Sequence, residues 1–181
     1  MTEITELLGS AREGDPAALE RIFEMVYPEL RRLAMSRLSR DHATLTPTEL
    51  VHDTFLRLIG ARRLDLEDRR HFFACAARAM RLIVIDRARR VAASKRGGEA
   101  LRVTWSEDLP QGAGDASSML DLDRALDHLQ GVNPRAHEVV NLRFFAGLTA
   151  PETAELLGLS LRTVNREWQK ARAFLYAQMC P

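Results

Sequence analysis

Apolar residues recur every three to four positions along most of the chain, the spacing that one face of an α-helix produces. The first such stripe predicts a helix over residues 2–12, which Gly14 ends. Asp15 and Pro16 then form an N-cap and first-turn pair, so a second helix should begin there. We expect Pro28 to kink or divide that helix, because proline removes a backbone donor.

A third helix should follow residues 44–47. Its predicted buried stripe consists of Leu50, Val51, Thr54, Phe55 and Leu58. The opposite face carries an apolar residue among acidic and polar ones: Glu49, His52, Asp53 and Leu56. This pattern is typical of a protein-docking surface, although one exposed leucine on a plain solvent face fits it equally well.

The fourth predicted helix, over residues 71–90, ends in dense positive charge. The residues expected to pack inward are Phe72, Phe73, Ala76, Met80, Ile83 and Val84, and the basic end comprises Arg87, Arg89, Arg90, Lys95 and Arg96. Such a cluster should attract phosphates. Basic residues late in a helix also complement its dipole, so part of the cluster would be favourable without a ligand.

Residues 97–118 lose the helical period and gather Gly, Pro, Ser and Asp, the composition of a linker between two helical domains. Trp105 within it could clasp one domain or stand exposed. Charge is segregated along the chain, with net values of −3 over residues 1–58, +7 over 59–104, −5 over 105–133 and +2 over 134–181. Two positive blocks suggest two contacts along a polyanion, and the acidic bridge could repel DNA or screen the basic faces. The alternative is that these charged segments only keep the protein soluble.

Helical spacing returns from Leu120, and Pro134 opens a further helix that Gly147 ends. Residues 149–176 then have the spacing of a helix-turn-helix: Ala154 suits a helix crossing, Gly158 a left-handed turn and Val164 an apolar anchor.

The second helix of this motif should start at the N-cap Ser160 and bury Val164, Trp168, Ala171 and Leu175. Its opposite face offers donors, amides and charges suited to base edges and phosphates: Arg162, Thr163, Asn165, Arg166, Gln169 and Lys170. A solvated polar face is the alternative interpretation.

Composition argues against other classes of protein. The chain has 181 residues, 46% of them hydrophobic, yet no apolar run approaches the roughly 20 residues that span a bilayer. Its start lacks the order of a signal peptide, so we expect a cytoplasmic location and no membrane contact. Cys75 and Cys180 lack CxxC spacing, and no HExxH, GxSxG or Walker sequence occurs. We therefore predict no catalytic residue, metal site or cofactor, and no enzyme.

The predicted elements, in this order, resemble the extracytoplasmic-function (ECF) sigma factors of bacterial RNA polymerase, which keep only regions 2 and 4. The sequences that carry the resemblance are ELVHDTFLRL at residues 49–58, IDRARR at 85–90, RFFAGLT at 143–149 and the helix-turn-helix. The resemblance implies an all-α fold of two small helical domains joined by a flexible acidic linker. Region 2 would occupy residues 1–96, the linker 97–118 and region 4 residues 119–181.

The resemblance also implies two partners, core RNA polymerase and promoter DNA as duplex and melted strand. Core polymerase would bind Glu49, His52, Asp53 and Leu56. The minus-10 element would contact Arg78, Arg81, Asp86, Arg87, Arg89 and Arg90, and the minus-35 element Ser160, Arg162, Thr163, Asn165, Arg166, Gln169 and Lys170. An anti-sigma factor is a further candidate partner.

Two positions depart from the family pattern. The docking helix usually begins with a more acidic run, whereas this chain has Thr46-Pro47-Thr48-Glu49, which weakens attraction to a basic site on the polymerase. We hypothesise that a Ser/Thr kinase restores the charge by phosphorylating Thr46 or Thr48, the alternative being that both threonines only cap the helix. Glu167 stands where relatives often carry a basic residue, so we do not predict it to contact DNA.

A rival hypothesis is a one-component helix-turn-helix regulator whose N-terminal part senses a ligand or dimerises. That protein would bind duplex DNA tightly by itself. A sigma factor would bind free DNA weakly and gain affinity when polymerase holds both domains.

Overall fold

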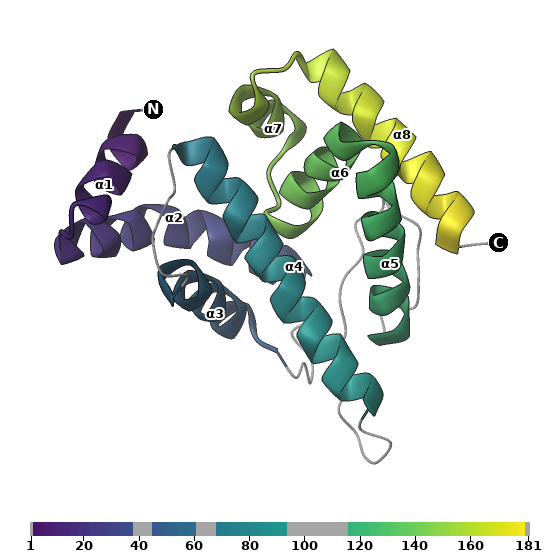
Figure 1. Cartoon of the computed structure of the whole chain (residues 1–181), viewed down its shortest axis with the longest axis horizontal. Coiled ribbons are helices and arrows are strands. Elements are labelled where there is room, and N and C mark those ends of the chain that lie inside the picture. The colour runs from purple at the N-terminus through teal and green to yellow at the C-terminus, as the bar shows by residue number, and fades with distance from the viewer. Residues whose placement is uncertain (1, 38–44, 61–67, 94–115, 180–181) are drawn as a thin grey trace.

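The computed structural model describes residues 2–37, 45–60, 68–93 and 116–179, and every regular element among them is helical (Figure 1). The all-α prediction is therefore confirmed. The elements are α1 (Thr2–Arg12), α2 (Pro16–Arg37), α3 (Pro47–Gly60), α4 (Arg69–Ala93), α5 (Ala116–Val132), α6 (Pro134–Val140), the π-helical segment η1 (Asn141–Phe145), α7 (Ala150–Leu157) and α8 (Leu161–Met179).

The start of α2 follows the predicted cap, and its length excludes one of the two effects expected of Pro28. Asp15 caps α2, since its carboxylate accepts a hydrogen bond from the Ala17 amide at 2.9 Å. Pro28 does not divide the helix, which continues from Pro16 to Arg37. The proline lies on the exposed face, while Val26 and Leu30 on either side are buried. Packing of the buried face therefore holds the helix together across the missing donor.

Helix α4 is the central element of the molecule. It packs against α3 along one side and against α5 and η1 along another (Figure 1). Buried residues of both halves, including Phe72, Phe73 and Phe144, belong to one hydrophobic cluster. The predicted inward face of α4 is confirmed, because all six of its residues are buried. Because α4 buries residues on two sides, it joins the helices before it (α1–α3) and the C-terminal half (α5–α8) in one hydrophobic core.

The segment before the helix-turn-helix was predicted as one helix and instead changes its winding. α6 ends at Val140, and η1 continues as a π-helix in which the Ala146 amide donates to the Asn141 carbonyl at 3.0 Å. The extra residue in this turn buries two adjacent aromatics, Phe144 and Phe145, with ring centroids 4.8 Å apart. Gly147 then ends the segment with a φ of 59°.

The first turn of α5 begins at Ala116, inside the stretch predicted as linker. The remainder of that stretch, with Trp105, lies outside the described residues, as do Lys95 and Arg96. The domain boundaries therefore stay a prediction.

Candidate nucleic-acid and polymerase interfaces

The helix-turn-helix forms as its spacing predicts. Thr149 and Glu152 make a reciprocal capping box at the start of α7: the Thr149 amide donates to the Glu152 carboxylate at 2.7 Å, and the Glu152 amide donates to the Thr149 hydroxyl at 3.3 Å. Gly158 ends α7 with a φ of 63°, in the left-handed region that favours glycine. Ser160 starts α8, because its hydroxyl accepts from the Thr163 amide at 3.1 Å.

The inner face of α8 anchors the motif to the C-terminal half. The four predicted inward residues, Val164, Trp168, Ala171 and Leu175, are all buried. The Arg143 guanidinium lies over the Trp168 ring at 4.1 Å, close enough for a cation–π contact. The orientation of the outer face of α8 is thereby fixed from beneath.

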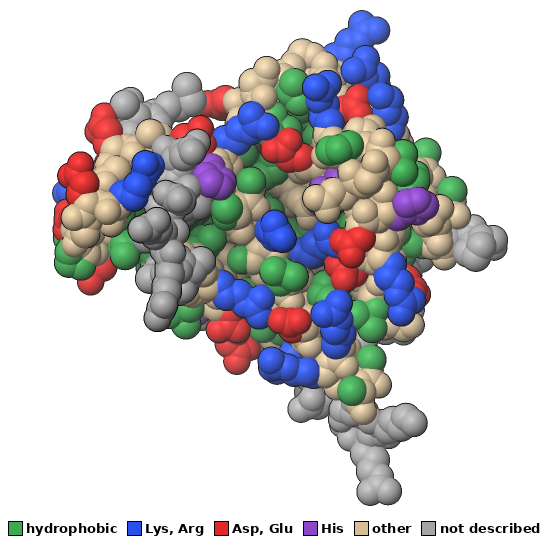
Figure 2. Space-filling view, in the orientation of Figure 1, with side chains coloured by type: hydrophobic (Ala, Val, Ile, Leu, Met, Phe, Trp, Pro, Cys, Tyr) green, Lys and Arg blue, Asp and Glu red, His purple; other side chains and the backbone are tan. Residues whose placement is uncertain are grey.

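The outer face of α8 presents most of the predicted DNA-reading side chains. Arg162, Asn165, Arg166, Gln169 and Lys170 are exposed, and Thr163 is half-buried. Figure 2 shows Lys and Arg side chains gathered over the end of α8 nearest α7. Helix α8 therefore brings the predicted minus-35 set together on one accessible surface.

One carboxylate beneath that surface was not foreseen. Glu167 is only 3% exposed and accepts hydrogen bonds from Asn133, Arg166 and Lys170. These bonds, first of all the one from Asn133, hold the pKa of Glu167 below its ordinary value. The sequence does offer a signal, since Glu167 stands one residue from Arg166 and three from Lys170.

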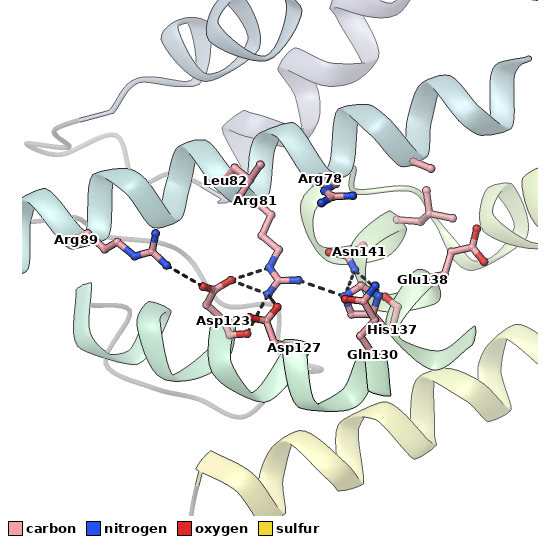
Figure 3. Close-up of a pocket in the computed structure, with 12 residues that line it drawn as sticks. Arg78, Arg81, Leu82, Arg89, Asp123, Asp127, Gln130, His137, Glu138 and Asn141 are labelled. Atoms are coloured by element: carbon pink, nitrogen blue, oxygen red, sulfur yellow. Dashed lines mark hydrogen bonds and ion pairs between the residues drawn. The ribbon is translucent and has the colours of Figure 1, made fainter. Parts of the chain in front are cut away.

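The predicted minus-10 residues on α4 lie in a different environment, which Arg81 dominates (Figure 3). Arg81 is 8% exposed, and its Nε donates to Asp123 of α5 at 2.8 Å. Its Nη2 donates to Asp127 at 2.5 Å, and its Nη1 lies 3.2 Å from His137 Nε2. Arg89 is a second link, with its Nη2 3.6 Å from Asp123. α5 and α6 therefore cover part of the face that was predicted to hold DNA.

His137 is neutral in this cluster. Burial, reinforced by the Arg81 guanidinium, lowers its pKa to about 4. A neutral ring can accept a hydrogen bond through Nε2, which suits the cationic donor Arg81. The cluster is therefore one guanidinium held between carboxylates and an uncharged imidazole.

Beside this cluster lies a cavity of about 330 Å³ between α4 and the C-terminal half (Figure 3). Arg78, Arg81 and Arg89 line it together with Asp123, Asp127 and Glu138. Basic and acidic side chains alternate over this face of the molecule in Figure 2. In this arrangement the α4 face is a mixed-charge contact between the two halves.

The remaining predicted minus-10 residues point elsewhere or stay accessible. Asp86 pairs with Arg57 of α3 at 2.8 Å, Arg87 is half-buried and Arg90 is exposed. The structure therefore gathers Arg78, Arg81 and Arg89 at the cavity and directs Asp86 towards α3.

The predicted docking face on α3 is exposed throughout. Leu56 is 64% exposed, and Glu49, His52 and Asp53 are exposed on the same helix. Glu49 also belongs to a capping box, since the Thr46 amide donates to its carboxylate at 2.7 Å and its own amide donates to the Thr46 hydroxyl at 3.2 Å. These bonds, chiefly the one from the Thr46 backbone, lower the pKa of Glu49.

An aromatic cluster adjoins His52 that the sequence reasoning did not identify as part of this face. Phe23 of α2 lies 4.4 Å from Phe55 and 5.6 Å from His52 between ring centroids, and Tyr27 lies 6.1 Å from His52. The i, i+4 spacing of Phe23 and Tyr27 is the signal that could have indicated it.

None of the helices among the described residues is long and apolar enough to cross a membrane.

Comparison with known proteins assigns the chain to a family. The family model described as "ECF sigma factor" matches residues 1–180. The chain is similar to the ECF RNA polymerase sigma factor BldN of Streptomyces coelicolor, with 27% identity over 155 residues that cover 84% of this chain. The match spans 57% of the length of that relative. Among solved structures, it is similar to CnrH, determined in complex with the cytosolic domain of CnrY, with 23% identity, coverage of 97% and 96% of the two chains and a TM-score of 0.43.

Proposed function

Because the chain belongs to the ECF sigma factor family, we propose that it is a promoter-specificity subunit that binds core RNA polymerase, directs it to minus-35 and minus-10 elements and assists DNA opening. The observation that carries this proposal is the α8 face, where side chains of the types that can read bases are exposed over a buried Trp168 in a family member. The subunit selects and positions, and the polymerase performs the chemistry.

The α8 face would read the minus-35 element in the major groove. Arginine forks match the acceptor edge of guanine, and amide side chains match adenine, so Arg162, Asn165, Arg166 and Gln169 are the discriminating residues. Lys170 would mainly bind phosphate, and Ser160 and Thr163 lie at the helix N-terminus, where phosphate oxygens are favoured. Exposure of these side chains, apart from the half-buried Thr163, supports the proposal.

The α4 face would hold the minus-10 element through Arg78, Arg81, Asp86, Arg87, Arg89 and Arg90. Asp123 and Asp127 now occupy donors of Arg81 that a phosphate would need. α5 and a nucleic-acid strand therefore compete for the same guanidinium group. We propose that α4 and α5 part when polymerase binds, which frees Arg81 at the promoter.

Core polymerase would dock on α3 through Glu49, His52, Asp53 and Leu56. An exposed leucine beside an aromatic cluster supplies apolar area, and the surrounding polar groups form a rim. This composition supports a protein partner rather than a solvated surface.

Control by an anti-sigma factor or by a Ser/Thr kinase belongs to the same proposal. Thr46 already uses its hydroxyl to cap α3, whereas Thr48 is exposed in the first helical turn. A phosphate on Thr48 would meet the positive end of the helix dipole and add charge to the docking face. Thr48→Asp should therefore tighten core binding, and unchanged affinity would contradict kinase control at this position.

The decisive experiment combines the purified chain with core polymerase and a library of promoter sequences, followed by sequencing of the transcripts. The proposal predicts specific transcripts whose templates share two boxes. Leu56→Asp should abolish them without unfolding the protein, and Val132→Asp is the matched control, because Val132 is 62% exposed on α5. Tight binding to duplex DNA without any transcript would favour the rival one-component regulator.

A further inference from the structure

Glu167 is a nearly buried carboxylate directly beneath the proposed DNA-reading face. Its Oε2 accepts from Asn133 Nδ2 at 3.1 Å, and its Oε1 accepts from Arg166 Nε at 3.3 Å and from Lys170 Nζ at 3.0 Å. Both oxygens are therefore engaged. Burial of a carboxylate is costly without such partners, so this arrangement fixes the position of its charge.

The anchor of Glu167 lies outside α8. Asn133 is the N-cap of α6, where its Oδ1 accepts from the Ala136 amide at 3.1 Å. The amide oxygen of Asn133 thus caps α6, and its amide nitrogen donates a hydrogen bond to Glu167. The hydrogen bond from Asn133 therefore holds the Glu167 carboxylate at the start of α6. The carboxylate stays in place when the side chain of Arg166 or Lys170 changes rotamer.

The two cations remain available to a ligand. The side chains of Arg166 and Lys170 are 61% and 54% exposed, whereas that of Glu167 is 4% exposed. The contact with Arg166 is made through Nε, and no hydrogen bond joins the terminal nitrogens of Arg166 to Glu167 among the described residues. Glu167 therefore restrains Arg166 through Nε and Lys170 through its terminal Nζ.

The charge of Glu167 has a further consequence. Lys and Arg attract any DNA through its phosphates, independent of sequence, whereas base reading depends on the direction of the donors. A fixed carboxylate between Arg166 and Lys170 offsets part of their positive charge and leaves their direction constrained. It should lower affinity for all DNA and preserve the preference for the correct sequence.

We infer that Glu167 is a positioning residue that sets the sequence selectivity of α8 by orienting Arg166 and Lys170 and by weakening their attraction to non-target DNA. The inference rests on the proposed reading of the minus-35 element by α8. It assigns a role to a residue that does not itself touch the bases.

The test is Glu167→Gln in the full chain, assembled with core polymerase. Two duplexes are compared over a range of salt concentrations, one carrying the minus-35 box that the wild-type holoenzyme selects and one with that box scrambled. We expect binding to the scrambled duplex to tighten about three- to tenfold and the preference for the selected box to fall by a similar factor. The salt slope should steepen by roughly 0.9, because about one more positive charge faces phosphate.

Two controls separate this role from a structural one. Glu155→Gln removes an equal charge from an exposed site on α7 and should leave the preference unchanged. In an Arg166→Ala background, Glu167→Gln should have a smaller effect on preference, because one of the side chains it orients is gone.

The outcomes are distinguishable. Weaker binding to both duplexes together with a lower melting temperature would overturn the inference and leave a purely structural role. An unchanged preference ratio would also overturn it. A wild-type holoenzyme that prefers no sequence at all would refute the proposed function, and the role of Glu167 with it.

Discussion

The basic faces of α4 and α8 hold similar side chains in opposite situations. On α4, Arg81 is 8% exposed, and the carboxylates that hold it come from another helix, α5. On α8, Arg166 and Lys170 stay exposed, and the carboxylate that holds them lies beneath them on the same helix. The carboxylates from α5 cover Arg81, whereas the carboxylate beneath Arg166 and Lys170 leaves these two cations accessible. For these cations, the origin of the carboxylate separates a closed contact from an accessible surface.

The largest expected effect removes the support of the α8 face. Trp168→Ala should lower the free energy of unfolding by about 3–5 kcal/mol, because it empties a large buried site and removes the contact with Arg143. Denaturant unfolding followed by circular dichroism measures the change. Tyr176→Ala is the control, since Tyr176 is 40% exposed on the same helix. A loss below about 1 kcal/mol would mean that α8 is held by something else.

The next variant should turn the α4 face into an exposed one. Asp123→Asn with Asp127→Asn leaves Arg81 without its charged partners and should weaken the contact between the halves by about 3 kcal/mol, the low end for a buried pair because Asp127 is exposed. Small-angle scattering should show a larger radius of gyration, and binding to a single-stranded minus-10 oligonucleotide should tighten.

Asp121→Asn is the matched control for that variant. Asp121 pairs with Arg124 on its own helix, so its loss should leave α4 covered. If the double variant stays as compact as the wild type and binds the oligonucleotide no better, α5 does not mask the α4 face.

A smaller effect is expected from the exposed α8 face itself. Arg162→Ala should reduce discrimination at one base pair of the minus-35 element by about 1–3 kcal/mol, with the melting temperature unchanged because the side chain is exposed. Competition binding with single-base variants of the promoter measures this effect. Arg135→Ala, an exposed arginine on α6, should leave base preference intact. Equal losses on every sequence would assign Arg162 to phosphate instead.

The smallest expected effect concerns the cap of the helix-turn-helix. Thr149→Ala should lower the free energy of unfolding by about 1 kcal/mol near pH 7. Hydrogen bonds, first from the Thr149 hydroxyl, lower the pKa of Glu152 in the folded state. Because the pKa of Glu152 is lower in the folded state than in the unfolded state, the ionised carboxylate stabilises the fold at pH values above its unfolded pKa. This stabilisation is lost as the pH falls through the folded pKa.

The difference between wild type and Thr149→Ala should therefore shrink when the pH falls from 7 to well below the ordinary range of a carboxyl group, which thermal unfolding at both pH values can measure. Thr5→Ala on α1 is the control, because Thr5 is exposed and should show no such pH dependence. A difference that is equal at both pH values would exclude a charged capping box.

Local chemistry was readable from the sequence. The bounds of α1, the Asp15 and Ser160 caps, the left-handed Gly158 and the exposure of Leu56 all follow from residue types at short spacing. These features depend on neighbours within a few positions. The predicted inward residues of α4 and α8 were confirmed for the same reason.

What the sequence did not reveal depends on distant partners. The partners of the buried Arg81 are Asp123 and Asp127 of α5, 42 and 46 positions further along the chain, and Asn133 reaches Glu167 across 34 positions. Periodicity contains no information about such pairs. The π-helical turn was missed because Asn141–Phe145 also fits an ordinary helical stripe, and Pro28 is tolerated because tertiary packing outweighs one missing hydrogen bond.

The contact of Arg81 with α5 has a consequence for binding of the free protein to DNA outside promoters. If the ion pairs of Arg81 contribute about 3 kcal/mol to closure, they lower the open fraction of the free chain roughly 150-fold. Its apparent affinity for an unpaired strand falls by the same factor. Stretches of single-stranded DNA exposed by replication or repair would then rarely capture the free protein. Assembly with polymerase would decide where, and when, the α4 arginines meet a melted strand.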